Sequence, residues 1–157
     1  MSDFVFEATA EQCTEQFGAA LAAALPDGTT IALCGTLGAG KTRLVQAIAV
    51  ACGVPREDVV SPTFVLCQQY RGTRTIYHLD AYRVRDQDEF RELGVEELFS
   101  TNALIIIEWA DRVAEGLPED YLRVDIEVTG PTARRFVVRP IGGRFEQFVA
   151  KLASDVF

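Results

Sequence analysis

The stretch from Gly35 to Thr42 constrains this chain more than any other part of it. Its residues, Gly-Thr-Leu-Gly-Ala-Gly-Lys-Thr, match the phosphate-binding loop pattern G-x-x-x-x-G-K-[ST]. Residues 30–34 before the loop read as a strand, and residues 43–52 after it carry apolar side chains at helical spacing. This strand–loop–helix order predicts an α/β domain that binds phosphate between its first central strand and the following helix.

Each residue type in the loop has a chemical reason. Glycines permit positive φ and lack a Cβ, so the backbone can curl and turn its N–H groups inward. Those donors and the positive end of the following helix form an anion site of phosphate size. The Lys41 ammonium can bridge the β- and γ-phosphates, and the Thr42 hydroxyl can ligate Mg²⁺. We expect nucleotide contacts from Gly35, Leu37, Gly38, Ala39, Gly40, Lys41 and Thr42.

Length and composition bound the remaining possibilities. A chain of 157 residues that is 48% hydrophobic suits one domain, residues 1–157, with a substantial core. The sequence has no bilayer-length apolar run and no signal-peptide pattern, so we expect a cytoplasmic protein without a membrane segment. Its four cysteines lack C-x-x-C spacing, which favours buried, reduced thiols. The net charge of −8 argues against a surface that grips nucleic acid as a whole, but a local basic patch remains possible.

The rest of the chain alternates strand and helix patterns. Thr9 and Gln12 have the spacing of a capping box at the start of a helix that ends near Leu25. The other predicted helices cover residues 43–52, 88–93, 95–99 and 144–153. Strands are predicted at 4–7, 30–34, 64–70, 74–79, 103–107, 121–128 and 133–139. Two hairpins among them predict a three-layer α/β domain of the P-loop NTPase type, with a mixed, mainly parallel central sheet and antiparallel hairpins.

Two acids follow predicted strands. Glu108 comes directly after the apolar run 103–107, at the carboxyl end of a central strand, where ligands bind in α/β sheets. There it can hold Mg²⁺ directly or through water. Asp80 ends another strand and can ligate Mg²⁺ or position the attacking water, although a lone aspartate there is also typical of a turn. Lys41, Asp80 and Glu108 are the candidate catalytic residues.

Three other features fit either a nucleotide site or ordinary structure. Ser61-Pro62-Thr63 lies where many phosphate-loop proteins have a nucleotide-sensing segment, but it also fits a proline turn. Strand alternation places His78 on the same face as Asp80, and a lone strand histidine is usually structural. Trp109 suits a core position and an exposed contact equally well.

Together these pieces resemble the TsaE (YjeE) family in order and spacing, over about residues 9–112. The resemblance is carried by the phosphate loop, Ser61-Pro62-Thr63-Phe64, Tyr77-His78-Leu79-Asp80-Ala81-Tyr82-Arg83 and Glu108-Trp109. It implies a small bacterial ATPase that acts with the TsaB and TsaD proteins in making N6-threonylcarbamoyladenosine at position 37 of tRNA. Such a protein reaches tRNA indirectly, through the complex. Its oligomeric state, monomer or otherwise, is left open.

The resemblance also implies roles for single residues. Lys41 and the loop amides would hold the phosphates of ATP or ADP. Thr42 and Glu108 would hold Mg²⁺, with Asp80 at the catalytic centre. The resemblance further assigns Thr63 to a switch segment, Trp109 to a place beside the metal ligand, Glu11 and Thr14 to a stretch near the nucleotide base, and Arg134 to nucleotide binding.

Two other functions stay open at this point. The one asparagine, Asn102, leaves no N-K-x-D motif to recognise guanine, which favours ATP over GTP. A kinase that transfers the γ-phosphate to a small hydroxyl acceptor is the main alternative, although no lid insertion or acceptor pocket is visible in the sequence. A nucleotide-gated binding module without meaningful turnover is a third reading.

Overall fold

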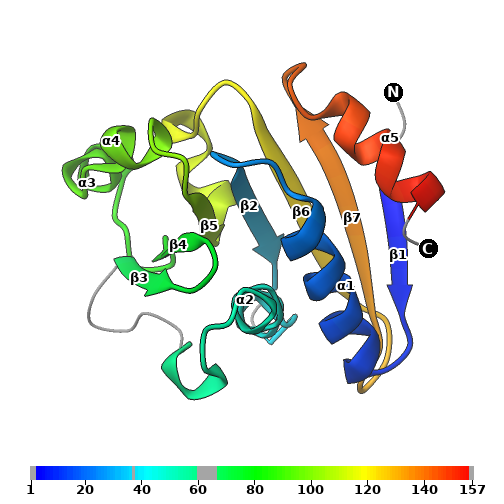
Figure 1. The fold of residues 1–157 in the computed structure, drawn as a ribbon. Helices are drawn as coiled ribbons and strands as arrows, with labels where there is room; N and C mark the ends of the chain where they lie inside the picture. The colour runs from blue at the N-terminus through cyan, green and yellow to red at the C-terminus, as the bar shows by residue number, and fades with distance from the viewer. Residues whose placement is uncertain (1–2, 37, 60–66, 156–157) are drawn as a thin grey trace.

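The computed structural model describes residues 3–36, 38–59 and 67–155, which form a twisted sheet with helices on both faces (Figure 1). The strands are β1 Phe4–Ala8, β2 Thr30–Gly35, β3 Cys67–Arg71, β4 Thr75–Asp80, β5 Leu104–Glu108, β6 Tyr121–Val128 and β7 Arg134–Ile141. The α-helices are α1 Glu11–Ala24, α2 Lys41–Ala51, α3 Gln87–Glu92, α4 Val95–Phe99 and α5 Glu146–Asp155. Two 3₁₀ segments, η1 Arg56–Asp58 and η2 Ala110–Gly116, complete the described elements.

The sheet is mixed, with strand order β1-β7-β6-β2-β5-β4-β3. At its centre β2 runs parallel to both β5 and β6, and β4 runs parallel to β5. The β3–β4 and β6–β7 hairpins are antiparallel, and β1 pairs antiparallel with β7 at the far edge. This arrangement confirms the predicted fold class. It also brings the carboxyl ends of β2, β4 and β5 to one edge of the sheet.

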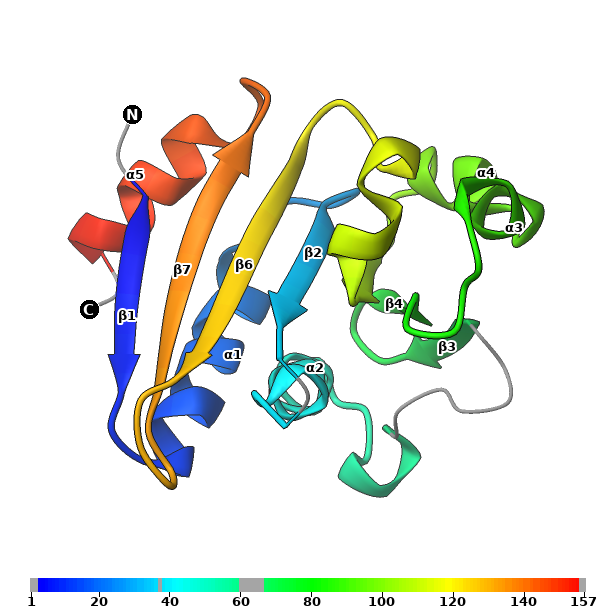
Figure 2. The same cartoon turned by 180° about the vertical axis from the view of Figure 1, so that it is seen from behind.

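Two apolar clusters lie on opposite faces of the sheet. Helices α1, α2 and α5 cover the face seen in Figure 1, where Phe17, Leu44 and Phe145 are buried. On the other face, η2 and the short helices α3 and α4 cover β4 and β5 (Figure 2), with Phe90 and Val113 buried. All five residues of β5 are buried, which explains why its sequence is a continuous apolar run with one acid at the end.

Helices α1 and α2 cross at Gly18. A Cβ at this position would lie 2.4 Å from the Cβ of Ala47, so the close approach of the two helices requires glycine. We predict that Gly18→Ala lowers the free energy of unfolding by about 1–3 kcal/mol, because the extra methyl overpacks a filled interface. Chemical denaturation would measure the loss. Gly143→Ala is the matched control, since a Cβ there meets no atom within 4 Å. Equal stability of the two variants would contradict the predicted close packing.

Several local predictions are wrong. Helix α1 begins at Glu11, and its N-cap is Ala10 without a side-chain cap, so Thr9 and Gln12 form no capping box. Thr9 lies one residue too early, and its hydroxyl instead lies 3.7 Å from Cys13 Sγ. The segment η2 was not predicted. Helix α2 begins at Lys41 and α5 at Glu146, two residues from their predicted starts in each case.

The cysteine prediction is correct in part. All four cysteines are free thiols, and Cys34 and Cys52 are buried, but Cys13 and Cys67 are only half-buried. Residues 60–66 lie outside the described residues, so the structure places neither the Ser61-Pro62-Thr63 segment nor the start of the first hairpin strand. Among the described helices, none has the length and apolar character needed to cross a membrane.

Candidate nucleotide site

The loop between β2 and α2 has the backbone that its glycines allow. Gly38 and Gly40 have φ of 80° and 106°, in the region that side chains disfavour. Gly40 is the N-cap of α2, so the amino end of that helix opens directly onto the loop. A Cβ at Gly35 would lie 2.9 Å from the carbonyl oxygen of Ile126 on β6, so at this position glycine is required by lack of space. Leu37, a predicted contact, lies outside the described residues.

The Lys41 side chain folds back over the loop. Its Nζ donates hydrogen bonds to the carbonyl oxygens of Gly35 at 2.7 Å and Thr36 at 2.9 Å. Burial lowers the pKa of Lys41, and this effect outweighs the opposite pull of Glu108, Asp111 and Asp80. The loop therefore holds a desolvated ammonium, and phosphate oxygens are suited to restore the solvation it has lost.

Trp109 lies directly against this ammonium. The Lys41 Nζ is 3.8 Å from the centroid of the indole ring, which is a cation–π contact. The centroid of the Tyr82 ring lies 4.9 Å from that of Trp109. Trp109 is the one non-glycine residue with positive φ in the described part of the chain, at 59°. That conformation turns the chain out of β5 into η2 and holds the half-buried indole beside the loop.

Glu108 joins the loop from the end of β5. It is 3% exposed, and the Thr42 hydroxyl lies 3.0 Å from each of its carboxylate oxygens. The two predicted metal ligands are therefore in direct contact, although 66 residues separate them in the sequence. Hydroxyl and carboxylate oxygens form the kind of donor set that Mg²⁺ accepts. Among the described residues no group of three or more acids, histidines and cysteines could hold a metal.

Asp80 lies beside Glu108 because β4 and β5 pair in parallel with these two residues in register. Its Oδ1 also accepts a hydrogen bond of 2.9 Å from the backbone N–H of Tyr82. Asp80 thus has both features that the sequence left open: it stabilises a turn, and it stands next to the acid at the strand end.

The remaining predicted contacts gather in one pocket of about 230 Å³ beside the loop. Arg134 reaches it from β7 and donates from Nε to the carbonyl oxygen of Ala39 at 2.8 Å. The pocket is lined by Glu11, Thr14, Ala39, Gly40, Arg43, Thr132, Arg134 and Phe136. The structure therefore brings Glu11, Thr14 and Arg134 together with the loop, as the predicted site requires, whereas Thr63 lies outside the described residues.

Sequence reasoning missed three members of this neighbourhood. Arg43 lines the pocket and bonds to Glu15, and Asp111 lies close enough to act on the charge of Lys41. His78 bonds directly to Glu108, although its sequence context suggested a structural histidine. The two-residue spacing of His78 and Asp80 was the available signal, because it places both on the face that carries Glu108.

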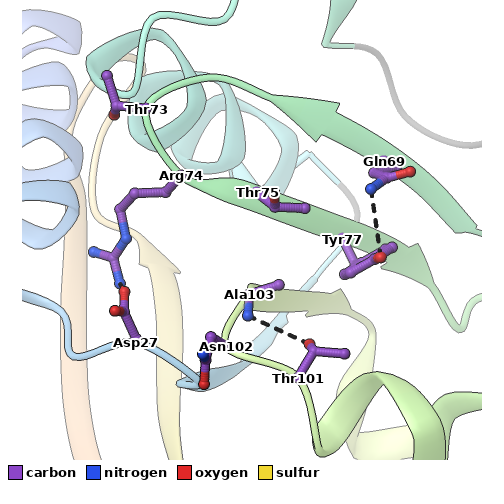
Figure 3. Close-up of a pocket in the computed structure, with 9 residues that line it drawn as sticks. All are labelled: Asp27, Gln69, Thr73, Arg74, Thr75, Tyr77, Thr101, Asn102 and Ala103. Atoms are coloured by element: carbon purple, nitrogen blue, oxygen red, sulfur yellow. Dashed lines mark hydrogen bonds and ion pairs between the residues drawn. The ribbon is translucent and has the colours of Figure 1, made fainter.

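A second pocket, of about 350 Å³, lies at the other end of the strands (Figure 3). It is formed where β4 begins and where the chain enters β2 and β5, by Asp27, Gln69, Thr73, Arg74, Thr75, Tyr77, Thr101, Asn102 and Ala103. Arg74 and Asp27 form an ion pair of 3.2 Å across one side of it. None of the predicted nucleotide or metal residues lines this pocket.

The fold and the site together define a class. A glycine-rich loop joins a parallel strand to a helix, and the Thr after the loop is bonded to an acid at the end of the neighbouring parallel strand β5. This is the arrangement of a P-loop nucleotide-binding protein. Within that class the chain belongs to the TsaE family: the family model described as "Threonylcarbamoyl adenosine biosynthesis protein TsaE" matches residues 8–136.

Individual relatives agree with this assignment. The protein named tRNA threonylcarbamoyladenosine biosynthesis protein TsaE in Treponema pallidum (strain Nichols) is 35% identical over 127 residues, 81% of this chain and 93% of that protein. The protein of the same name in Bacillus subtilis (strain 168) is also 35% identical, over 80% of this chain and 78% of its own. The crystal structure of Bacillus subtilis YdiB superposes with a TM-score of 0.79 at 25% identity, covering 98% and 95% of the two chains.

Proposed function

We propose that this chain is an ATP-binding and ATP-hydrolysing accessory protein of the machinery that makes N6-threonylcarbamoyladenosine at position 37 of tRNA. It would act with TsaB- and TsaD-type proteins in the cytoplasm. The observation that carries the proposal is the contact of Thr42 with Glu108 beside the buried Lys41 ammonium. The names of the relatives supply the pathway.

The side chains suggest how the site works. Thr42 and Glu108 would hold Mg²⁺, which supplies positive charge to the β- and γ-phosphate oxygens when bound. Lys41 would leave the carbonyls of Gly35 and Thr36 to contact the same phosphates. Asp80, beside Glu108, would either orient the attacking water or complete the metal site.

The pocket beside the loop suits the rest of the nucleotide. Arg134 closes it from β7, and Glu11 and Thr14 come from the first turn of α1. In this proposal the base or ribose lies in the pocket while the phosphates follow the loop toward Lys41. The net charge of −8 supports contact with tRNA through protein partners rather than by this chain alone.

ATP hydrolysis by the purified protein tests this function. We predict slow hydrolysis to ADP and phosphate by the protein alone, and a several-fold higher rate when TsaB and TsaD are added. Radiolabelled γ-phosphate should appear only as inorganic phosphate. A labelled organic product that requires a hydroxyl acceptor would instead support a kinase. ATP binding with no turnover in the presence of both partners would support the nucleotide-gated binding module.

A further inference from the structure

A continuous series of side-chain hydrogen bonds runs from strand to strand across β3, β4 and β5 and reaches Glu108. His78 on β4 is fully buried, and its Nε2 lies 2.5 Å from Glu108 Oε2. On the other side of the ring, Nδ1 lies 2.9 Å from the Tyr70 hydroxyl on β3. That hydroxyl is also 2.8 Å from Gln68 Oε1. The series therefore runs from the edge strand β3 through His78 and Glu108 to Thr42 on α2.

Strand register explains why these side chains meet. His78 pairs with Ile106 across the parallel β4–β5 ladder, so Glu108 is its diagonal neighbour two residues further on. Tyr70 pairs with Ile76 across the antiparallel β3–β4 ladder, so it too is a diagonal neighbour of His78. Diagonal neighbours on one face of a sheet are within reach of aromatic and long side chains.

Because these hydrogen bonds are buried, the loss of any one of them would destabilise the protein. Ile76 and Ile106 are both 0% exposed and Tyr70 is 5% exposed, so little water reaches the His78 ring. A buried polar atom without a partner destabilises a protein by about 1–3 kcal/mol. Nε2 faces a carboxylate, which accepts hydrogen bonds when ionised, so Nε2 donates an N–H to Glu108.

Glu108 is consequently held by two donors from different elements, the Thr42 hydroxyl of α2 and the His78 ring of β4. Thr42 is itself a proposed metal ligand, so its hydroxyl changes surroundings when an ion arrives. The bond from His78 comes from a fully buried ring on the neighbouring strand β4 and does not depend on the ion. A carboxylate that is held in this way is oriented before it binds a metal.

We propose that His78 is a positioning residue of the nucleotide site, whose Nε2–H holds the Glu108 carboxylate in the orientation that serves Mg²⁺, while Tyr70 fixes the ring. This inference rests on the proposed nucleotide function and adds a residue to it. It differs from a purely structural histidine in one respect: loss of the Nε2 donor should weaken magnesium binding specifically.

Two amide substitutions separate these roles. The side-chain amide nitrogen of His78→Gln can take the place of Nε2 and keep a donor toward Glu108. His78→Asn keeps a polar group near Nδ1 and Tyr70 but leaves nothing at the position of Nε2. Both variants place an amide in the same buried site, so each is the matched control of the other for general damage to the fold.

The measurement has two parts. Isothermal titration calorimetry gives the Kd of ADP in EDTA. Titration of Mg²⁺ into the ADP-saturated protein, followed by the emission of Trp109, the chain's single tryptophan, gives the apparent Kd of Mg²⁺. We expect His78→Asn to raise the Mg²⁺ Kd about tenfold or more, with His78→Gln within about threefold of wild type. The Kd of ADP in EDTA should stay unchanged in both variants.

Each other outcome decides a different point. Equal Mg²⁺ affinity in His78→Asn and wild type, or equal losses in both variants, would overturn the positioning role. A wild-type protein that binds ADP without any response to Mg²⁺ would also overturn it, while leaving nucleotide binding intact. A wild-type protein that binds no ADP would reject the proposed function itself.

Discussion

Lys41→Met is expected to lower kcat/KM for ATP hydrolysis by about 10²–10³-fold, because it removes a charged hydrogen-bond donor to the transferred phosphate. Methionine keeps an apolar stem of similar length but removes the ammonium that lies over the Trp109 ring, so the loss is one of charge and hydrogen bonding. Removal of the ammonium relieves the cost of burying a charge, but it also removes the hydrogen bonds to the carbonyl oxygens of Gly35 and Thr36. The unliganded form of each variant is therefore the reference for its own response to ADP.

Steady-state kinetics and thermal unfolding together test this prediction. ADP at a hundred times its Kd should stabilise the wild-type protein by about 2.7 kcal/mol, and the same ADP concentration should have little effect on Lys41→Met. Lys151→Met is the matched control, since Lys151 is the chain's other lysine and lies exposed on α5. Unchanged kinetics and an unchanged ADP response in Lys41→Met would remove Lys41 from the phosphate site.

Glu108→Gln is expected to reduce magnesium-dependent hydrolysis by a similar factor, about 10²–10³-fold, because the neutral amide is a weak ligand for a hard cation. The shape is kept, and the amide oxygen can still accept one hydrogen bond from Thr42 or His78. The variant should therefore fold. Glu108→Ala would in addition leave both donors without a partner, at about 1–3 kcal/mol of stability for each buried group.

Hydrolysis at saturating Mg²⁺ and denaturant unfolding separate the two effects. The exposed Glu96 of α4 supplies the control Glu96→Gln, which should match wild type in both measurements. Wild-type turnover in Glu108→Gln would show that this carboxylate is dispensable to the chemistry. Normal tRNA modification in cells despite lost turnover would instead favour a protein that works by nucleotide binding alone.

The local parts of the site were predictable because their chemistry is local. The loop from Gly35 to Thr42 needs positive φ, small residues and a following helix, and each requirement is visible in adjacent residues. Glu108 could be found because a strand buried on both faces reads as an apolar run, and an acid at its end has few structural reasons to be there. The predicted capping box at Thr9 is wrong although its spacing fits the pattern, because the N-cap of α1 is Ala10, one residue after Thr9.

The roles of His78 and Asp111 could not be predicted in the same way. The sequence shows a histidine and an aspartate near other candidate residues, but it does not show what lies across the sheet from them. His78 meets Glu108 because β4 and β5 pair in one particular register, and Asp111 approaches Lys41 because Trp109 turns the chain back toward the loop. Both are contacts between segments: the two-residue spacing of His78 and Asp80 shows a shared strand face, but it does not show which residue of β5 lies beside them.

The sequence by itself predicted a phosphate-binding loop before a helix, identified the acid that ends the central strand, and indicated the family that the chain resembles. Only the tertiary structure decided how the distant residues assemble. Thr42 meets Glu108 across 66 residues, and Arg134 meets Ala39 across 95. The physical reason is that motifs follow from backbone conformation over a few residues, whereas these contacts follow from strand order and register in a seven-stranded sheet.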